Sequence, residues 1–293
     1  MFIATLIAKD RLPGGVISAA EDALRRVDVE PMGRSWIEED VACDLLFSAS
    51  LGPVRLALEG IFPGVDVIVQ GEAGRRKRLL VADMDSTMIT IECIDELADY
   101  AGIKAEISAV TERAMQGELD FESALTERVK LLKGLDASVI DRCHDERVRI
   151  TPGAIALVRT MKREGARCIL VSGGFTVFAD RVAAEIGFDR AISNRLEVAG
   201  GKLKGSLGLP IVGAEAKREA LVAEAAMAGI ELEATLAVGD GANDIPMLQS
   251  AGLGVAFHAK PAAAAAADAR IEYGDLGTLL YAQGYARGEW EAA

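Results

Sequence analysis

The feature that most limits the fold of this chain is an alternation of short apolar runs with helical stretches beyond residue 78. The apolar runs are LLVAD (79–83), RCILVSGG (167–174), RAISNRLEV (190–198), TLAVGDG (235–241) and LGVAFHA (253–259). Between them, stretches such as 153–165 and 214–229 carry apolar residues at helical spacing. Strands that alternate with helices build βαβ units, and strands buried on both faces are continuously apolar. The sequence therefore predicts an α/β fold with a Rossmann-like parallel sheet as its core.

One segment interrupts this alternation. Residues 94–149 show little strand pattern, but helical periodicity recurs at 94–102, 104–117, 121–134 and 137–148. Because this segment directly follows the first strand and its loop, we expect a helical insertion that covers the end of the sheet as a cap.

Residues 1–74 differ in character from the rest. In order, they give a strand (2–8), a helix (15–28), one or two strands (36–49), a second helix (53–62) and a closing strand (65–70). This order predicts a small α+β domain, followed by a larger domain at 75–293. The polar and basic segment GEAGRRKR (71–78) is the expected linker.

Charge and cysteine content restrict the partners. The formal net charge of −13 opposes binding to nucleic acid or an anionic membrane, because both draw affinity from Lys and Arg. The four cysteines form no C-x-x-C pair, so we expect them reduced and buried, as in a cytosolic protein. The N-terminus has no basic start, and its apolar stretch ends at Lys9 and Asp10. Neither a secretion signal nor a membrane span is indicated, so the cytoplasm is the expected location.

Polar residues follow the apolar runs. In open α/β sheets the ligand site lies outside the carboxyl ends of the strands. The ends of three runs carry Asp83 and Asp85, Ser172 and Gly173, and Asp240, Asn243 and Asp244. If these ends converge, four carboxylates share a small space, and they repel one another unless a cation compensates.

The residue types indicate which cation. Only two histidines are present and no thiolates cluster, so zinc and copper are poorly supplied with ligands. Mg²⁺ accepts one or two carboxylates and completes its shell with water and a phosphate oxygen. Ser172, the amides of the following glycines and Lys217 would bind that phosphate. One aspartate could then attack phosphorus, while the other acts as general acid and base.

Less specific interpretations exist for each motif. Asp83 and Asp85 could cap a helix, residues 240–244 could form a solvated turn, and Lys217 could lie on a helix surface. An EF-hand is excluded because the glycine and the distal glutamate fall at the wrong offsets. The chain also lacks the G-K-[ST] of a phosphate loop and the third glycine of a dinucleotide fingerprint.

Taken in order and spacing, these motifs resemble a known family. DMDST (83–87), VSGG (171–174), Lys217 and GDGANDIPML (239–248) are similar to the four motifs of the haloacid dehalogenase superfamily of phosphotransferases. IECIDELA (91–98), GELDFESALTERVKLLKGL (117–135) and ITPGA (150–154) extend the resemblance to the members that act on O-phospho-L-serine. The resemblance covers about residues 78–290.

The resemblance implies a role for each motif residue. Asp83 would be the nucleophile and Asp85 the general acid and base. Mg²⁺ would be held by Asp83, the backbone carbonyl of Asp85 and Asp240, with support from Asp244 and Asn243. Ser172, Gly173 and Lys217 would bind phosphate. The amino-acid end of the substrate would be bound by Glu92, Phe121 and Arg128, with Asn243 also at the substrate.

The cap residues suit a phosphorylated amino acid. Its ammonium and carboxylate need at least one acid and one arginine, and Arg128 can hold a carboxylate with two hydrogen bonds. Alternatively, Glu92 and Arg128 are ordinary surface charges, and Phe121 is a core residue.

Residues 1–74 resemble only the outline of an ACT-like domain, a fold that often binds amino acids or mediates dimerisation. Fold alone does not give function, so a structural role, a homodimer through this domain and amino-acid sensing all stay open.

The leading hypothesis is a Mg²⁺-dependent phosphomonoesterase that releases serine from O-phospho-L-serine, the last step of serine biosynthesis by resemblance. The alternatives are the same chemistry on another small phosphorylated metabolite, and an amino-acid-sensing regulatory protein.

Overall fold

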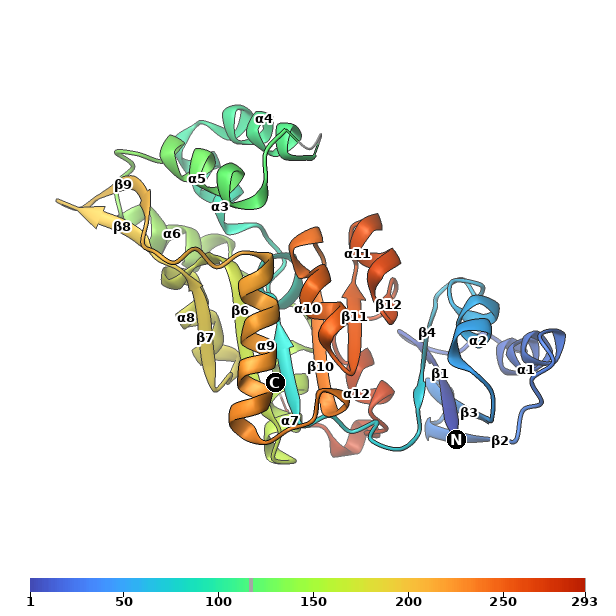
Figure 1. Ribbon diagram of the computed structural model, residues 1–293. Coiled ribbons are helices and arrows are strands. Elements are labelled where there is room, and N and C mark those ends of the chain that lie inside the picture. Colours follow the sequence, from blue (N-terminus) through green and yellow to red (C-terminus); the bar gives the residue numbers. More distant parts are fainter. Residues whose placement is uncertain (116–117, 293) are drawn as a thin grey trace.

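Six of the strands beyond residue 78 form one parallel sheet in a computed structural model that describes residues 1–115 and 118–292. Six strands lie in the order β12-β11-β10-β5-β6-β7, and every neighbouring pair is parallel (Figure 1). They are β5 (Leu79–Ala82), β6 (Arg167–Phe175), β7 (Arg190–Asn194), β10 (Thr235–Gly239), β11 (Leu253–Phe257) and β12 (Ala269–Ile271). The predicted α/β class with a parallel sheet is confirmed.

Helices cover both faces of this sheet. They are α7 (Ala154–Arg163), α8 (Thr176–Ile186), α9 (Ala214–Ala228), α10 (Ile245–Ser250), α11 (Pro261–Ala266) and α12 (Thr278–Ala282). In β5, Leu80 and Ala82 pack into the hydrophobic cluster that includes α7, α8 and α12, whereas Leu79 and Val81 pack into the cluster of α9 and α10. Side chains alternate between the two faces of a strand, so a strand covered on both faces must be apolar throughout.

The insertion after β5 is helical, as expected. It contains α3 (Cys93–Ala101), α4 (Lys104–Met115), α5 (Phe121–Leu131) and α6 (Ser138–Arg147). Gln116 and Gly117, at the end of one predicted helix, lie outside the described residues. The start of α5 is set by Asp120, whose Oδ1 accepts a hydrogen bond from the amide of Ser123 at 2.7 Å. In Figure 1, α4 and α5 lie over the end of the sheet toward which the strand arrows point.

One strand prediction was wrong. The run 190–198 is not a single strand, because β7 ends at Asn194 and β8 (Leu196–Ala199) belongs to a separate antiparallel pair with β9 (Lys202–Leu207). This hairpin joins the cap through two backbone hydrogen bonds of 2.9 Å between Leu203 and residues 134 and 135. Its buried Leu196 and Leu203 pack with the cap, so the apolar pattern continues although the chain has left the sheet.

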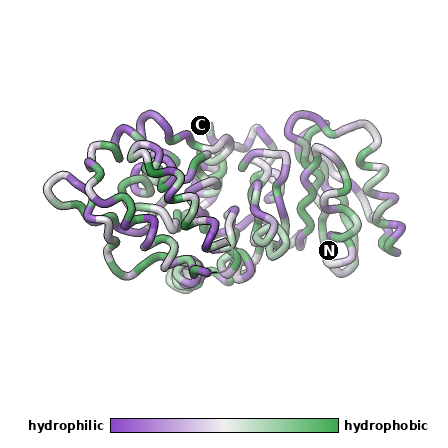
Figure 2. Tube along the Cα trace, turned by 90° about the horizontal axis from the view of Figure 1, so that it is seen from above, coloured by the Kyte–Doolittle hydropathy of each residue, from purple (hydrophilic) through white to green (hydrophobic). Residues whose placement is uncertain are grey.

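The N-terminal residues form their own sheet. Its elements are β1 (Phe2–Ala8), α1 (Val16–Arg26), β2 (Gly33–Glu38), β3 (Ala42–Phe47), α2 (Leu51–Leu58) and β4 (Val65–Gly71). The strands are antiparallel in the order β2-β3-β1-β4, and a separate hydrophobic cluster lies between this sheet and its two helices. Seen from above, this part is a lobe beside the larger one (Figure 2).

The segment expected to be a linker is packed rather than free. Arg75 Nη1 lies 2.6 Å from Asp44 Oδ2, and its Nη2 donates to the carbonyl of Ala282 at 3.1 Å. Lys77 is buried and donates to the carbonyl of Glu233 at 2.9 Å. The contacts of Arg75 join the two parts, and both Arg75 and Lys77 are polar side chains that the sequence pattern assigns to solvent.

All four cysteines are buried and free, as predicted. Within the described residues, none of the helices combines the length and the apolar character that crossing a membrane requires.

Candidate active site

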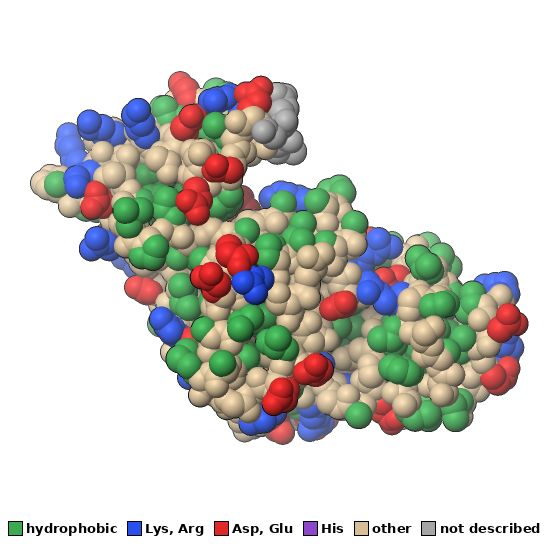
Figure 3. Space-filling view, viewed as in Figure 1, with side chains coloured by type: hydrophobic (Ala, Val, Ile, Leu, Met, Phe, Trp, Pro, Cys, Tyr) green, Lys and Arg blue, Asp and Glu red, His purple; other side chains and the backbone are tan. Residues whose placement is uncertain are grey.

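The carboxyl ends of β5, β6 and β10 meet beneath the cap at a cavity of about 460 Å³. Of the predicted site residues, those that line it are Asp83, Asp85, Glu92, Phe121, Arg128, Ser172, Gly173, Asp240 and Asn243. The other two, Lys217 and Asp244, are fully buried behind Asp83. Figure 3 shows the hollow between the cap and the body of the molecule. The structure therefore brings all the predicted residues to one place.

Lys217 joins two of the aspartates. It lies on α9, and its Nζ is 2.6 Å from Asp83 Oδ1 and 2.7 Å from Asp244 Oδ1. Burial by itself lowers the pKa of Lys217, but Asp244 and Asp83 raise it above the ordinary value, so the side chain is an ammonium. The interpretation of Lys217 as a solvated helix residue is thereby wrong.

Burial and the charge of Asp244 raise the pKa of Asp83 well above its usual range, although Lys217 acts in the opposite direction. The single ammonium does not balance the carboxylates around it. A carboxylate in this environment is costly to the fold, which is typical of a functional group rather than of a helix cap.

Asp244 is fixed by the glycine-containing turn after β10. Its Oδ2 accepts hydrogen bonds from the amides of Asp240 at 3.2 Å and Gly241 at 3.0 Å. A Cβ at Gly239 would lie 2.4 Å from Asp244 Cγ, so this close approach requires glycine. Asp240, Gly241 and Asp244 are buried in this turn and joined by these bonds, while Ala242 is exposed, so the two carboxylates do not belong to a solvated turn.

Asp83, Asp240 and Asp244 could hold a metal ion. Each offers a carboxylate oxygen, and these three oxygens lie within 4.8 Å of one another. Burial raises the pKa of Asp240 to about 6, although the charge of Lys260 acts in the opposite direction, and Asp244 raises it further. Three carboxylates face the buried ammonium of Lys217 and the exposed ammonium of Lys260, which still leaves an excess of negative charge, and all the donors are hard oxygens. The residues therefore fit a hard divalent cation rather than zinc or copper.

Asp85 lies in the same cavity but in a different environment. The chain kinks after it, where Ser86 has a φ of 54°, and Asp85 Oδ1 accepts a hydrogen bond from the amide of Cys93 at 3.1 Å. Burial, followed by the charge of Glu92, raises the pKa of Asp85 to about 7. A carboxyl group that exchanges its proton near neutral pH suits general acid and base chemistry.

The end of β6 forms the opposite wall. Ser172 Oγ accepts a hydrogen bond from the amide of Gly174 at 2.8 Å. A Cβ at Gly173 would lie 2.7 Å from Phe121 Cζ, and one at Gly174 would lie 2.6 Å from Asp85 Oδ2. Glycine at both positions allows Phe121 and Asp85 to approach the strand end closely. Phe121 is thus a wall of the cavity as well as a packing residue.

The cap supplies one carboxylate, Glu92, and one guanidinium, Arg128, to the cavity. Glu92 Oε1 accepts a hydrogen bond from Ser86 Oγ at 2.7 Å. Arg128 is half-buried on α5, and none of the described residues forms an ion pair with it. Burial lowers the pKa of Arg128, while Asp95 and Glu92 act to raise it. Its Nε donates a long hydrogen bond to the carbonyl of Ala124 at 3.4 Å, and a half-buried guanidinium without an ion-pair partner can bind an anion through its other N–H groups.

Two residues of the site were missed from the sequence. Asn194, at the end of β7, donates from Nδ2 to the carbonyls of Gly173 at 2.9 Å and Val212 at 3.2 Å, and its Oδ1 accepts from the amide of Val212 at 2.7 Å. Lys260 follows β11 and lines the cavity, 3.6 Å from Asp240 Oδ2. Lys260 comes just after the recognised run 253–259, so extending the search to that strand end would have found it, whereas Asn194 lies inside the run 190–198, where the sequence does not mark the end of β7.

Replacing Asn194 with alanine is expected to lower the free energy of unfolding by about 3 kcal/mol, because three backbone groups, two of them buried, lose their partners. The loop at Gly173 would also loosen, so activity should fall about tenfold. Ser193→Ala is the matched control, since the buried Ser193 hydroxyl has no partner among the described residues. Chemical denaturation and kinetics on both variants test this, and equal stability of the two would contradict it.

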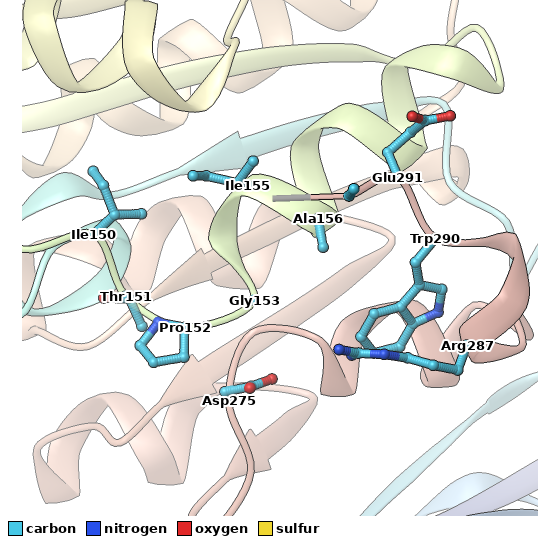
Figure 4. Close-up of a pocket in the computed structure, with 11 residues that line it drawn as sticks. Ile150, Thr151, Pro152, Gly153, Ile155, Ala156, Asp275, Arg287, Trp290 and Glu291 are labelled. Carbon is cyan, nitrogen blue, oxygen red and sulfur yellow. The ribbon is translucent and has the colours of Figure 1, made fainter.

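A second cavity, of about 360 Å³, lies between the start of α7 and the C-terminal residues (Figure 4). Its charged residues already have partners: Asp275 Oδ1 accepts from the amide of Gly277 at 2.7 Å, and the Arg287 guanidinium stacks 4.2 Å from the ring centre of Trp290. None of the predicted site residues lines this cavity.

Comparisons with known proteins agree with this geometry. The model of the haloacid dehalogenase-like hydrolase family matches residues 80–249, more than half of the chain. The phosphoserine phosphatase of Streptomyces coelicolor is 48% identical over 245 residues, which are 82% of this chain and 60% of that relative. This chain therefore spans about three fifths of that relative's length.

Solved structures are similar as well. A probable phosphoserine phosphatase from Vibrio cholerae, in unliganded form, has a TM-score of 0.77 and 34% identity, with 98% of this chain and 87% of that chain covered. A substrate-bound phosphoserine phosphatase complex has a TM-score of 0.66 and 41% identity, with 70% of this chain and 97% of that chain covered.

Proposed function

The chain belongs to the haloacid dehalogenase-like hydrolase family, and on this premise we propose that it hydrolyses O-phospho-L-serine to L-serine and phosphate. One observation carries the proposal: a single cavity contains Asp83 and Asp85 at the strand ends and Glu92 and Arg128 in the cap. The first pair suits phosphoryl transfer, and the second suits an ammonium and a carboxylate. The names of the relatives described above support the same substrate.

In the proposed reaction, Asp83 is the nucleophile. Lys217 holds one oxygen of Asp83, and the other attacks phosphorus to form an aspartyl-phosphate while the bond from phosphorus to the serine oxygen breaks. Asp85 gives its proton to the leaving serine oxygen. A water then attacks the aspartyl-phosphate and gives a proton to Asp85, which releases phosphate and regenerates both residues.

The phosphoryl group needs positive charge and hydrogen-bond donors around it. We propose that Ser172, Gly173 and Lys217 provide them. Mg²⁺ would be held by Asp83, Asp240 and the backbone carbonyl of Asp85, with Asp244 and Asn243 behind them; when bound, it stabilises charge on the phosphoryl oxygens. The excess of carboxylates in this cluster supports that assignment.

At the other end of the cavity, we propose that Arg128 binds the carboxylate of the substrate and that Glu92 binds its ammonium. Phe121 and Asn243 would contact the atoms between these groups and the phosphate. An analogue that lacks either charged group would leave Glu92 or Arg128 unpaired in the closed site, which explains how such a pocket selects an amino acid.

Substrate selection by the cap can be tested directly. Arg128→Ala and Glu92→Gln are expected to lower kcat/KM for O-phospho-L-serine about 100-fold, since each removes a charge-assisted contact. Hydrolysis of an aryl phosphate, which lacks the amino-acid end, should fall less than about threefold. Steady-state kinetics on both substrates with Mg²⁺, and then with EDTA, test the assignment. Equal losses on the two substrates would contradict it and favour another small phosphorylated metabolite.

The N-terminal part is proposed as a separate domain of residues 1–74, with residues 75–293 as the catalytic domain. Its own hydrophobic cluster supports this division. Strand β2 lies at the edge of the N-terminal sheet and carries the exposed Trp36. Pairing of this edge with the same edge of a second copy would give a homodimer. Calorimetry with serine would test an amino-acid-sensing role of this domain.

The buried, unpaired cysteines support a location in the reducing cytoplasm.

A further inference from the structure

We propose that Lys260 binds the substrate phosphate at the mouth of the active-site cavity, and that Asp66 of the N-terminal part holds Lys260 in position. This inference rests on the phosphatase activity proposed above. It assigns one new substrate-binding residue and one positioning residue to that reaction.

The cationic side chains of the cavity indicate a role for Lys260 in binding the phosphate. Among the described residues, Arg128 and Lys260 are the two cationic side chains that line it. Lys217 lies behind the cavity and is held by its two aspartates, so it acts on the phosphate as a fixed charge. If Arg128 binds the carboxylate, Lys260 is the remaining mobile cation for a phosphate that carries nearly two negative charges.

Lys260 is placed to do this without being fixed by its own ion pair. Its backbone amide donates to the carbonyl of Asp240 at 2.9 Å, so the main chain is anchored beside the aspartate cluster. Its side chain is 67% exposed, and Nζ lies 3.6 Å from Asp240 Oδ2. Asp240 is buried, but the Lys260 end of the pair is in water and 3.6 Å is longer than a direct hydrogen bond, so the ammonium can turn to a bound phosphate.

The turn that carries Lys260 is held by His258. This residue adopts a φ of 43°, and its amide donates to the carbonyl of Ile271 at 2.9 Å. Its Nε2 lies 2.8 Å from the carbonyl oxygen of Gly274. Because a carbonyl only accepts hydrogen bonds, Nε2 carries the proton. His258 therefore ties the turn at 258–260 to the loop at 272–274.

That loop is in turn held by the N-terminal part. Asp66, on β4, is buried, and its Oδ1 accepts from the amides of Glu272 at 2.8 Å and Tyr273 at 3.2 Å. Its Oδ2 accepts from the amide of Gly274 at 2.7 Å. Three consecutive amides thus bind one carboxylate across the interface, where β4 lies beside β12 (Figure 1).

These contacts form a continuous path from Asp66 through Gly274 and His258 to Lys260. The interface also contains an independent polar contact, in which Arg75 pairs with Asp44 and donates to the carbonyl of Ala282. That contact reaches α12 and not the turn at 258–260. Arg75→Gln is therefore a matched control, since it weakens the same interface without touching the path.

The first experiment concerns Lys260. At saturating Mg²⁺, Lys260→Met is expected to raise KM for O-phospho-L-serine about tenfold with kcat changed less than about threefold, and Lys260→Arg should restore most of the loss. In an Asp83→Asn background, calorimetry should show the same weakening of O-phospho-L-serine binding. A KM within about twofold of wild type for Lys260→Met would overturn the assignment.

The second experiment concerns Asp66. Asp66→Asn should raise KM about threefold or more, Arg75→Gln should leave KM unchanged, and Asp66→Asn should add nothing in a Lys260→Met background. If Asp66→Asn does not fold, His258→Leu replaces it, with the same expectation. Equal effects of Asp66→Asn and Arg75→Gln, or multiplying effects in the double variant, would overturn the positioning role. If wild type released no phosphate from O-phospho-L-serine, the proposed function would fail instead.

Discussion

Replacing Asp83 with asparagine is expected to abolish phosphate release while making the protein more stable than the wild type without Mg²⁺. An amide cannot act as the nucleophile, so kcat should fall by about 10⁴-fold or more. The folded state raises the pKa of Asp83 well above its usual range, which means that ionised Asp83 costs folding free energy. Asparagine removes that cost, and each pKa unit corresponds to about 1.4 kcal/mol.

The sign of this stability effect depends on pH. A carboxyl group with a raised pKa in the folded state costs nothing below its unfolded-state pKa, and its full cost appears above the raised value. The advantage of Asp83→Asn should therefore grow as the pH rises. Denaturation in EDTA at several pH values, with phosphate-release assays in Mg²⁺, measures both effects, and Asp22→Asn on the exposed face of α1 is the control. Retained phosphatase activity in Asp83→Asn would refute the nucleophile assignment.

Replacing Lys217 with methionine is expected to damage both stability and activity. The substitution leaves Asp83 and Asp244 buried without their shared ammonium, and breaking such a buried pair costs about 3–5 kcal/mol. The phosphate also loses a positive charge that lies directly behind the nucleophile. Activity should therefore fall about 10³-fold or more.

The control for this variant is Lys204→Met. Lys204 is exposed and pairs with Glu197 at 2.8 Å, so its loss should change stability by less than about 1 kcal/mol and leave activity intact. Thermal unfolding and initial rates compare the two variants. Since a divalent cation compensates carboxylates in the same way, Mg²⁺ should restore part of the stability lost in Lys217→Met. Unchanged stability in that variant would show that the two aspartates are not held by Lys217.

Much of the architecture could be predicted because it follows from local patterns. A strand covered on both faces must be apolar throughout, so β5, β10 and β11 were recognisable as parallel strands. The hairpin β8–β9 was not recognised, because the apolar pattern continues from the sheet into the cap. Nothing in the run 190–198 marks Asn194 as the point where the chain leaves the sheet.

The sequence by itself determined the class of fold and the acidic residues at the strand ends, because both depend on neighbours within a few positions along the chain. Only the tertiary structure decided that Lys217 is buried between two aspartates, that Asn194 holds the loop at Gly173, and that Asp66 reaches the loop beside His258. Each of these contacts joins residues that are distant in sequence. The burial and charge of such a side chain depend on what packs against it, which its own sequence neighbourhood does not specify.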